Sequence, residues 1–333
     1  MKTDDLTIPL FFVRRLSIGF TQYMINDQFP LSIQADDIST NLETTREWIF
    51  KNRAELLAKL SIHGALLLRG FPVASAEDFD SCVKEFKLEN FTYAESLSNA
   101  VRNNRTERVF TANEAPPAVE IFLHHEMAQT PIYPNKLIFF CEKASEYGGA
   151  TPLCRSDRLL DLLVSKVPKF VRELEEKRVQ YTNVMPAEAD LESGQGRTWQ
   201  ETLGADNRRG AELRLKKLGY TWRWLDGENL RVTTPVLPAI RKLADGRRVF
   251  FNQLIAAYLG WKDSRNKTTK AIRYGDGSEI SNDGMQVVFE LSESITFDQR
   301  WINGDIVLVD NFLVMHGRRP FTGTRKILAS LSL

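Results

Sequence analysis

Apolar residues recur at helical spacing in the first part of the chain. Over residues 44–60 they follow a period of roughly 3.6, which predicts a helix; they are Trp48, Ile49, Leu56, Leu57 and Leu60. His63 and Gly64 end this helix. A second helix is expected over about residues 76–86, with Ser75 as its N-cap, because a serine side chain accepts a hydrogen bond from a free N–H of the first turn.

Short apolar runs then predict buried strands. They lie at residues 64–71 (GALLLRGF), 136–141 (KLIFFC), 305–311 (DIVLVDN) and 326–333 (KILASLSL). A continuous apolar run is typical of a strand buried on both faces. Two Asp-Gly steps, at residues 226–227 and 245–246, adjoin β-like runs, and such a step favours a tight hairpin.

Helical patterns separate some of these strands. One helix is expected over about residues 158–177 and a shorter one over 207–218, with Asp206 as its cap and Gly219 as its stop. We therefore expect a mainly β protein with flanking helices (α+β) and a helical insert at about residues 155–220. A jelly-roll core fits best, because two paired sheets leave few strand edges open.

Composition and charge narrow the class of protein. Lys and Arg number 44 against 43 Asp and Glu, for a net charge of +1, which gives no support to a nucleic-acid-binding surface. The apolar runs reach only about six residues, too short for a membrane span, and the first residues show no secretory signal. Three cysteines, Cys82, Cys141 and Cys154, without a C-x-x-C pair indicate a reducing cytoplasm.

Histidine is scarce, at four residues, and two short motifs contain three of them. FLHHEMAQTP places His124 and Glu126 two residues apart, so in extended backbone they point to one face while His125 points away. His316 follows an apolar strand in VLVDNFLVMHGRRPF. Two imidazoles and a carboxylate suit non-haem Fe(II) and leave three coordination positions open. Because residues 124–126 and 316 must then meet, a single domain over residues 1–333 is expected.

Other interpretations of these residues stay open. An H-x-E string also arises by chance, and His63, at a helix end, illustrates a structural histidine that meets the helix dipole. A set of two histidines and a glutamate also serves catalytic zinc, although zinc peptidases usually carry H-E-x-x-H on a helix and this chain has no such string.

Two further residues fit a carboxylate-binding role. If His316 ends one strand and KILASLSL begins its neighbour, Arg325 re-enters beside the metal, where a guanidinium holds a carboxylate bidentately. Thr151, in GGATPL, could donate its hydroxyl to the same group. The alternatives are a solvated turn charge for Arg325 and a plain turn residue before Pro152 for Thr151.

Motifs in a set order run along most of the chain. They are GALLLRGF (64–71), LHHEMAQTP and KLIFFCEKASEYGGATPL (123–153), WQETLG (199–204), WRWLDGENLRV (222–232), VFFNQ (249–253) and W-x-N-G-D…DN…HGRRPF-x-G-x-R (301–325). Together they resemble the TauD/TfdA family of Fe(II)/2-oxoglutarate-dependent dioxygenases. Within that family the likeness is to the SyrP-like and clavaminate synthase-like branch.

The resemblance implies a double-stranded β-helix in which His124, Glu126 and His316 hold Fe(II). Arg325 and Thr151 would bind the distal carboxylate of 2-oxoglutarate, whose keto acid end chelates the metal. Members of the family consume O2, decarboxylate 2-oxoglutarate to succinate and abstract hydrogen from their substrate. Halogenating relatives carry Gly or Ala in place of Glu126, so the carboxylate favours hydroxylation.

The chain departs from the family pattern in two places. His125 stands where relatives often have Asn or Thr, so an adjacent imidazole could shift the ligand by one position. Residues 96–106 (SLSNAVRNNRT) replace a Ser-Pro-Arg-type stretch that lines the site in relatives, which makes Arg102 a candidate substrate residue. Asn252 and Gln253 follow an apolar run and are further candidates to face the substrate, although an Asn after a strand is commonly a turn residue.

We therefore expect an enzyme that hydroxylates an aliphatic C–H of an amino acid or natural-product intermediate, free or tethered to a carrier protein. Desaturation or epoxidation would use the same residues. A jelly-roll binding protein without turnover and a zinc hydrolase are the alternatives from other classes. No membrane or nucleic-acid partner is expected, and nothing in the sequence indicates an oligomeric state.

Overall fold

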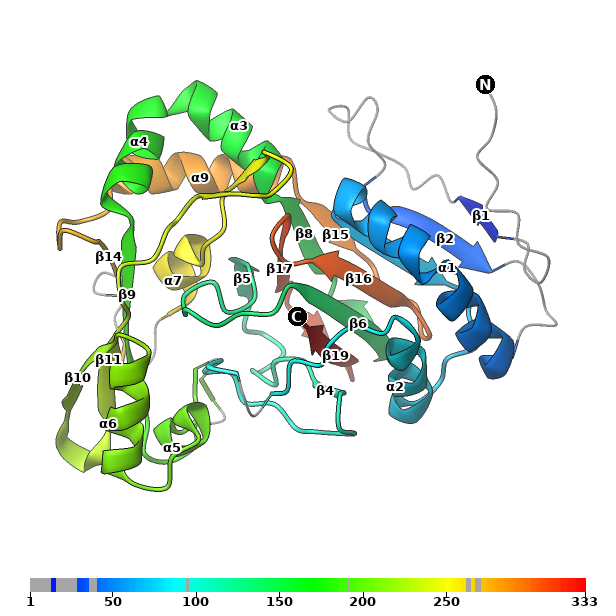
Figure 1. The fold of residues 1–333 in the computed structure, drawn as a ribbon, viewed down its shortest axis with the longest axis horizontal. Coiled ribbons are helices and arrows are strands. Elements are labelled where there is room, and N and C mark those ends of the chain that lie inside the picture. The colour runs from blue at the N-terminus through cyan, green and yellow to red at the C-terminus, as the bar shows by residue number, and fades with distance from the viewer. Residues whose placement is uncertain are drawn as a thin grey trace.

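The architecture comes from a computed structural model of the chain (Figure 1). It describes residues 13–15, 29–35, 41–93, 96–190, 192–193, 195–261, 265–266 and 271–333. Two sheets form the centre, and helices and a third sheet surround them. Within the described residues, no helix combines the length and the apolar character needed to cross a bilayer.

The larger sheet joins the first and last parts of the chain. Its neighbours pair antiparallel, except that β2 and β3 run parallel. Its seven strands lie in the order β1 (Val13–Arg15), β2 (Leu31–Ala35), β3 (Ala65–Arg69), β16 (Ile306–Asp310), β6 (Lys136–Lys143), β19 (Lys326–Ser332) and β4 (Phe110–Thr111). The four apolar runs expected as strands are all in this sheet, at β3, β6, β16 and β19.

Strand β3 shows why these runs are continuously apolar. Leu66 and Leu68 pack on one side against helices, whereas Ala65 and Leu67 belong to the core on the other side. The helices are α1 (Leu42–His63) and α2 (Ala76–Glu85). Ser75 caps α2 as predicted, with its Oγ accepting from the N–H of Asp78, and Gly64 ends α1 with a φ of 80°.

The smaller sheet carries the site. Its antiparallel strands lie in the order β15 (Phe297–Gln299), β8 (Thr151–Arg155), β17 (Val314–Arg318) and β5 (Ile121–His124). One hydrophobic cluster contains Phe139, Val307 and Ile327 of the larger sheet together with Leu153 and Val314 of the smaller. The two sheets therefore share a core. A two-stranded ribbon, β7 (Tyr147–Gly148) with β18 (Phe321–Thr322), adjoins the smaller sheet.

The long segment between β8 and β15 departs from a purely helical insert. It holds a further sheet, in the order β10 (Thr221–Trp224), β11 (Leu230–Thr233), β9 (Val179–Met185) and β14 (Ile272–Tyr274). The expected insert at about residues 155–220 therefore includes a strand, β9. Around it lie α3 (Ser156–Lys166), α4 (Pro168–Lys177), α5 (Trp199–Leu203), α6 (Arg208–Lys217), α7 (Leu254–Gly260), α9 (Asn282–Ser294) and the hairpin of β12 (Arg241–Lys242) with β13 (Arg248–Val249).

Two helix predictions in this segment were wrong in detail. The single helix expected over residues 158–177 is two helices, because Pro168 has no N–H to continue α3 and instead begins α4 at its first position. Helix α6 is capped by Asn207, whose Oδ1 accepts from the N–H of Gly210, and not by Asp206. The Asp226–Glu228 turn joins β10 to β11, as the Asp-Gly step predicted.

Candidate active site

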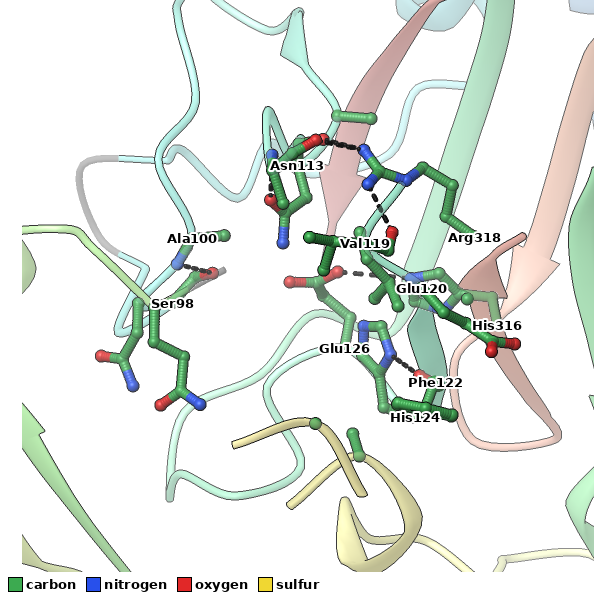
Figure 2. Close-up of a pocket in the computed structure, with 18 of the residues that line it drawn as sticks. Ser98, Ala100, Asn113, Val119, Glu120, Phe122, His124, Glu126, His316 and Arg318 are labelled. Atoms are coloured by element: carbon green, nitrogen blue, oxygen red, sulfur yellow. Dashed lines mark hydrogen bonds and ion pairs between the residues drawn. The ribbon is translucent and has the colours of Figure 1, made fainter. Parts of the chain in front are cut away.

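Three side chains from distant parts of the chain meet at the smaller sheet. One ligand atom each from His124, Glu126 and His316 lies within 4.8 Å of the others. Figure 2 shows the two imidazoles and the carboxylate pointing toward one another. His316 Nε2 is 3.5 Å from Glu126 Oε2, and the two imidazole centroids are 4.4 Å apart. The sequence therefore named three residues that the fold brings together.

Strand pairing accounts for the meeting of the two histidines. His124 ends β5 and lies directly opposite His316 of the antiparallel β17. Glu126 follows in a turn, where Asn311 holds its backbone: Asn311 Oδ1 accepts from Glu126 N–H (2.8 Å), and Asn311 Nδ2 donates to the Glu126 carbonyl (3.0 Å). Because Asn311 lies between β16 and β17, it joins the two ligand-bearing segments.

The histidine next to His124 has a different role. His124 Nδ1 donates to the Phe122 carbonyl (2.8 Å), which leaves Nε2 as the metal-binding nitrogen. The His125 ring is fully buried and lies between the backbone carbonyls of Asn311 and Phe250. Burial lowers the pKa of His124 to about 4, so this ring is neutral near pH 7, and burial also lowers the pKa of His125. His125 thus faces away from the cluster.

Glu126 is ionised despite its burial. Burial acts to raise the pKa of this carboxyl group, but the guanidinium of Arg102 and the two imidazoles lower it, with a net result well below its ordinary value. Arg102 Nη2 is 3.0 Å from Oε1 and 3.1 Å from Oε2 of Glu126. Arg102, a candidate substrate residue from the sequence, therefore contacts a cluster carboxylate.

Arg325 and Thr151 lie together in the same cavity. Arg325 Nε donates to the Gly149 carbonyl (2.9 Å), and Nη2 donates to Thr151 Oγ1 (3.3 Å). Trp301 Nε1 donates to the same hydroxyl oxygen (3.0 Å), so the Thr151 proton is free to be donated to a ligand. Burial lowers the pKa of Arg325 to about 10, which leaves the guanidinium charged at neutral pH.

The cluster faces a cavity of about 490 Å³, within the range of small-molecule sites. Gln253 lines it, and its Nε2 donates to the His125 carbonyl (3.0 Å). Asn252 does not line it: its Nδ2 donates to the Ala239 carbonyl and its Oδ1 accepts from Leu254 N–H. Asn252 is thus a buried turn residue, the alternative that the sequence left open.

Arg318 is a cavity residue that sequence reasoning missed. Its guanidinium donates to the carbonyls of Asn113, Ala115, Pro116 and Val119, at 2.7–3.2 Å. It thereby holds one wall of the cavity (Figure 2). The only sequence signal for Arg318 was its place in the motif HGRRPF. Asn311 was likewise missed, and its only signal was the DN pair in the same group of motifs.

Comparison with known proteins gives the same family as the motifs. The family model described as taurine catabolism dioxygenase TauD, TfdA family, matches residues 27–331. A clavaminate synthase-like protein of Arabidopsis thaliana is 39% identical over 269 residues, covering 80% of this chain and 81% of the relative. The dapdiamide synthesis protein DdaC of Enterobacter agglomerans is 28% identical over 287 residues, covering 82% and 83%.

Solved structures share the fold. PvcB from Pseudomonas aeruginosa has a TM-score of 0.53 at 15% identity, covering 100% of this chain and 95% of its own. An asparagine oxygenase in complex with Fe(II), 2S,3S-3-hydroxyasparagine and succinate also has a TM-score of 0.53, at 12% identity, covering 88% and 83%. With the family match over residues 27–331, the chain belongs to the TauD, TfdA family and is an Fe(II)/2-oxoglutarate-dependent oxygenase.

Proposed function

We propose that this oxygenase hydroxylates an aliphatic C–H bond of an amino acid or related natural-product intermediate, free or carrier-tethered. His124, Glu126 and His316 hold Fe(II), and Arg325 with Thr151 binds the distal carboxylate of 2-oxoglutarate. The observation that carries the proposal is the His-Glu-His cluster in one cavity with the Arg325–Thr151 pair.

The donor set fits Fe(II). Two imidazoles and one carboxylate supply a facial triad on one side of an ion and leave the opposite side open. His316 Nδ1 is buried without a hydrogen-bond partner among the described residues, whereas its Nε2 faces Glu126. Bound Fe(II), with 2-oxoglutarate and O2, supplies the oxidising power for the attack on an unactivated C–H bond.

The chain's own residues bind the carboxylate of 2-oxoglutarate and orient the substrate. The planar guanidinium of Arg325 pairs with a carboxylate, and the Thr151 proton adds a second donor. Glu126 occupies the position whose loss accompanies halogenation in relatives, which supports hydroxylation. Arg318 fixes the wall at residues 113–119, so that the substrate meets a preformed surface.

The cavity and the relatives support a small polar substrate. Phe122, Ala256 and Trp261 supply apolar lining, and Asn99, Gln129 and Gln253 supply carboxamides. The dapdiamide synthesis protein and the asparagine oxygenase are named for amide- and amino-acid-type molecules. Desaturation or epoxidation is the second candidate, because it would use the same cluster.

The fold itself supports two structural proposals. The larger sheet and the sheet β15-β8-β17-β5 share one hydrophobic core, which supports a double-stranded β-helix (jelly-roll) in a single domain. We also propose a cytoplasmic location, supported by the free and buried state of Cys82, Cys141 and Cys154.

A non-catalytic binding protein of the same fold is the alternative from another class. Such a protein has no need for two histidines and a glutamate that converge in one cavity with the Arg325–Thr151 pair. A zinc hydrolase would work without O2 and 2-oxoglutarate, so both alternatives are open to a direct test.

The test is anaerobic addition of Fe(II) and 2-oxoglutarate to the purified apoprotein. We expect a metal-to-ligand charge-transfer band in the wild type and none in His316→Ala. Succinate release and a mass-spectrometric screen of amino acids follow, with a gain of one oxygen indicating hydroxylation and a loss of two hydrogens indicating desaturation. No band in the wild type, or an equal band in His316→Ala, would refute the proposal.

A further inference from the structure

Arg102 and Glu126 form a buried ion pair beside the cluster. Their side chains are only 8% and 4% exposed. A single nitrogen, Arg102 Nη2, spans the two carboxylate oxygens at 3.0 and 3.1 Å. The guanidinium therefore contacts both atoms through which Glu126 can bind a metal.

The backbone next to Arg102 is held by two hydrogen bonds between Asn103 and Thr111. The Asn103 N–H donates to Thr111 Oγ1 (2.9 Å), and Thr111 N–H donates back to the Asn103 carbonyl (2.9 Å). The guanidinium also lies 5.4 Å from the ring centroid of Phe110, a cation–π distance. Arg102 thus reaches the carboxylate from a segment that hydrogen-bonds to strand β4.

The glutamate is held at its other end as well. Asn311 fixes the Glu126 backbone through its N–H and its carbonyl. With the backbone and the carboxylate both held, rotation of the side chain about its own bonds is restricted. The arrangement orients the carboxylate before any metal arrives.

We propose that Arg102 is a positioning residue: its Nη2, nearly equidistant from the two Glu126 oxygens, occupies the place that a metal chelated by both oxygens would take, so that the carboxylate binds the metal through one oxygen alone. The inference rests on the proposed function, in which His124, Glu126 and His316 hold the metal. A glutamate can bind through one oxygen or both, and binding through both takes a second position. The facial triad leaves three positions, which chelated 2-oxoglutarate and O2 together require.

Charge alone does not explain the contact. A cation beside a metal site repels the metal, so Arg102 does not serve to attract Fe(II). Its geometric contribution is one guanidinium nitrogen held in a fixed place against both carboxylate oxygens, which a lysine ammonium on a flexible stem does not reproduce. Arg102→Lys keeps the positive charge and removes the guanidinium geometry, so it separates the effect of charge from the effect of geometry.

The experiment compares Mn(II)-loaded wild type with Arg102→Gln and Arg102→Lys. Arg105→Gln is the matched control, because Arg105 lies on the same segment, is 40% exposed and pairs with Glu142 at 3.4 Å. Crystal structures report how many Glu126 oxygens bind the metal, and calorimetric titration reports 2-oxoglutarate affinity. Thermal unfolding of each loaded protein checks that the variants fold, and if Arg102→Gln does not fold, Arg102→Lys decides.

We expect one bound oxygen in wild type and Arg105→Gln, and two in both Arg102 variants. We also expect 2-oxoglutarate affinity about tenfold weaker in both Arg102 variants. One bound oxygen in both variants, two in wild type, or weakened affinity in Arg102→Gln with normal affinity in Arg102→Lys would overturn the inference. If wild type binds Mn(II) at the cluster but gives no charge-transfer band with Fe(II) and 2-oxoglutarate, the proposed function fails, and the number of bound oxygens still decides the role of Arg102.

Discussion

Replacing Asn311 by alanine tests how the cluster is held together. The Asn311 side chain is fully buried and makes three hydrogen bonds: it accepts from Glu126 N–H and donates to the carbonyls of Glu126 and Pro134, at 2.7–3.0 Å. Alanine removes all three and leaves a buried N–H and two buried carbonyls without that partner. The turn that carries Glu126 then loses its tie to the β16–β17 connection.

The magnitude follows from these contacts. Three hydrogen bonds at about 1 kcal/mol each amount to about 3 kcal/mol, and the cost of unpaired buried partners extends the range to about 5 kcal/mol. This is a large fraction of the free energy of unfolding of a typical domain, about 5–15 kcal/mol. Because Glu126 also becomes free to move, we expect Mn(II) affinity to weaken by about tenfold or more.

The assay is urea unfolding of the metal-free protein together with Mn(II) titration. Asn303→Ala is the control, because Asn303 is exposed and its Oδ1 accepts a single hydrogen bond, from Ala144 N–H (2.7 Å). It should change the free energy of unfolding by less than about 1 kcal/mol and leave Mn(II) affinity unchanged. If Asn311→Ala behaves like Asn303→Ala in both measurements, Asn311 does not organise the cluster.

Three further predictions concern metal binding at the cluster, the cavity wall held by Arg318 and the buried cysteine thiols. Mn(II) at about 100 times its Kd should raise the free energy of unfolding of wild type by about 2.7 kcal/mol and leave His316→Ala unchanged, as measured by urea unfolding; an equal rise in both would place the metal elsewhere. Arg318→Met should speed proteolysis within residues 113–119 by about tenfold, because four carbonyls lose their donor; an unchanged cleavage rate would show that the wall is held by other contacts. Burial raises the pKa of Cys82, Cys141 and Cys154 to about 12. Since thiols of the unfolded chain ionise near pH 8.5, the free energy of unfolding should fall as pH rises from about 9 to 12. Ellman's reagent should leave native thiols unlabelled at pH 8, and fast labelling of the folded protein would contradict their burial.

Local signals determined much of the fold. The buried strands at β3, β6, β16 and β19 were readable because both of their faces pack, so each contains a continuous run of apolar residues. Ser75 marked the start of α2 for the equally local reason that a cap bonds within its own first turn. The error over residues 158–177 was local too: Pro168 stood in the sequence as a helix breaker, and the apolar pattern on either side masked it.

The chemistry of the candidate ligands was likewise present in the sequence. Residue type and spacing selected His124 and Glu126, and the settings of His316, Thr151 and Arg325 selected these three; the order of motifs then pointed to the family. What the sequence could not determine was the use of side chains whose partners lie far along the chain. Asn311 bonds a residue 185 positions away, and Arg318 bonds carbonyls about 200 positions away.

Arg102 shows the limit most clearly. From the sequence it was a candidate to touch substrate; in the folded protein its guanidinium lies on Glu126, 24 positions along the chain. Asn252 was also a candidate to touch substrate, but its side chain is hydrogen-bonded to the backbone at Ala239 and Leu254. The sequence by itself determined which side chains could bind a metal or a carboxylate, because that capacity depends on the residue type. The tertiary structure decided which groups remain free to do so, because hydrogen-bonding capacity depends on the partners that strand pairing and turns bring within about 3 Å.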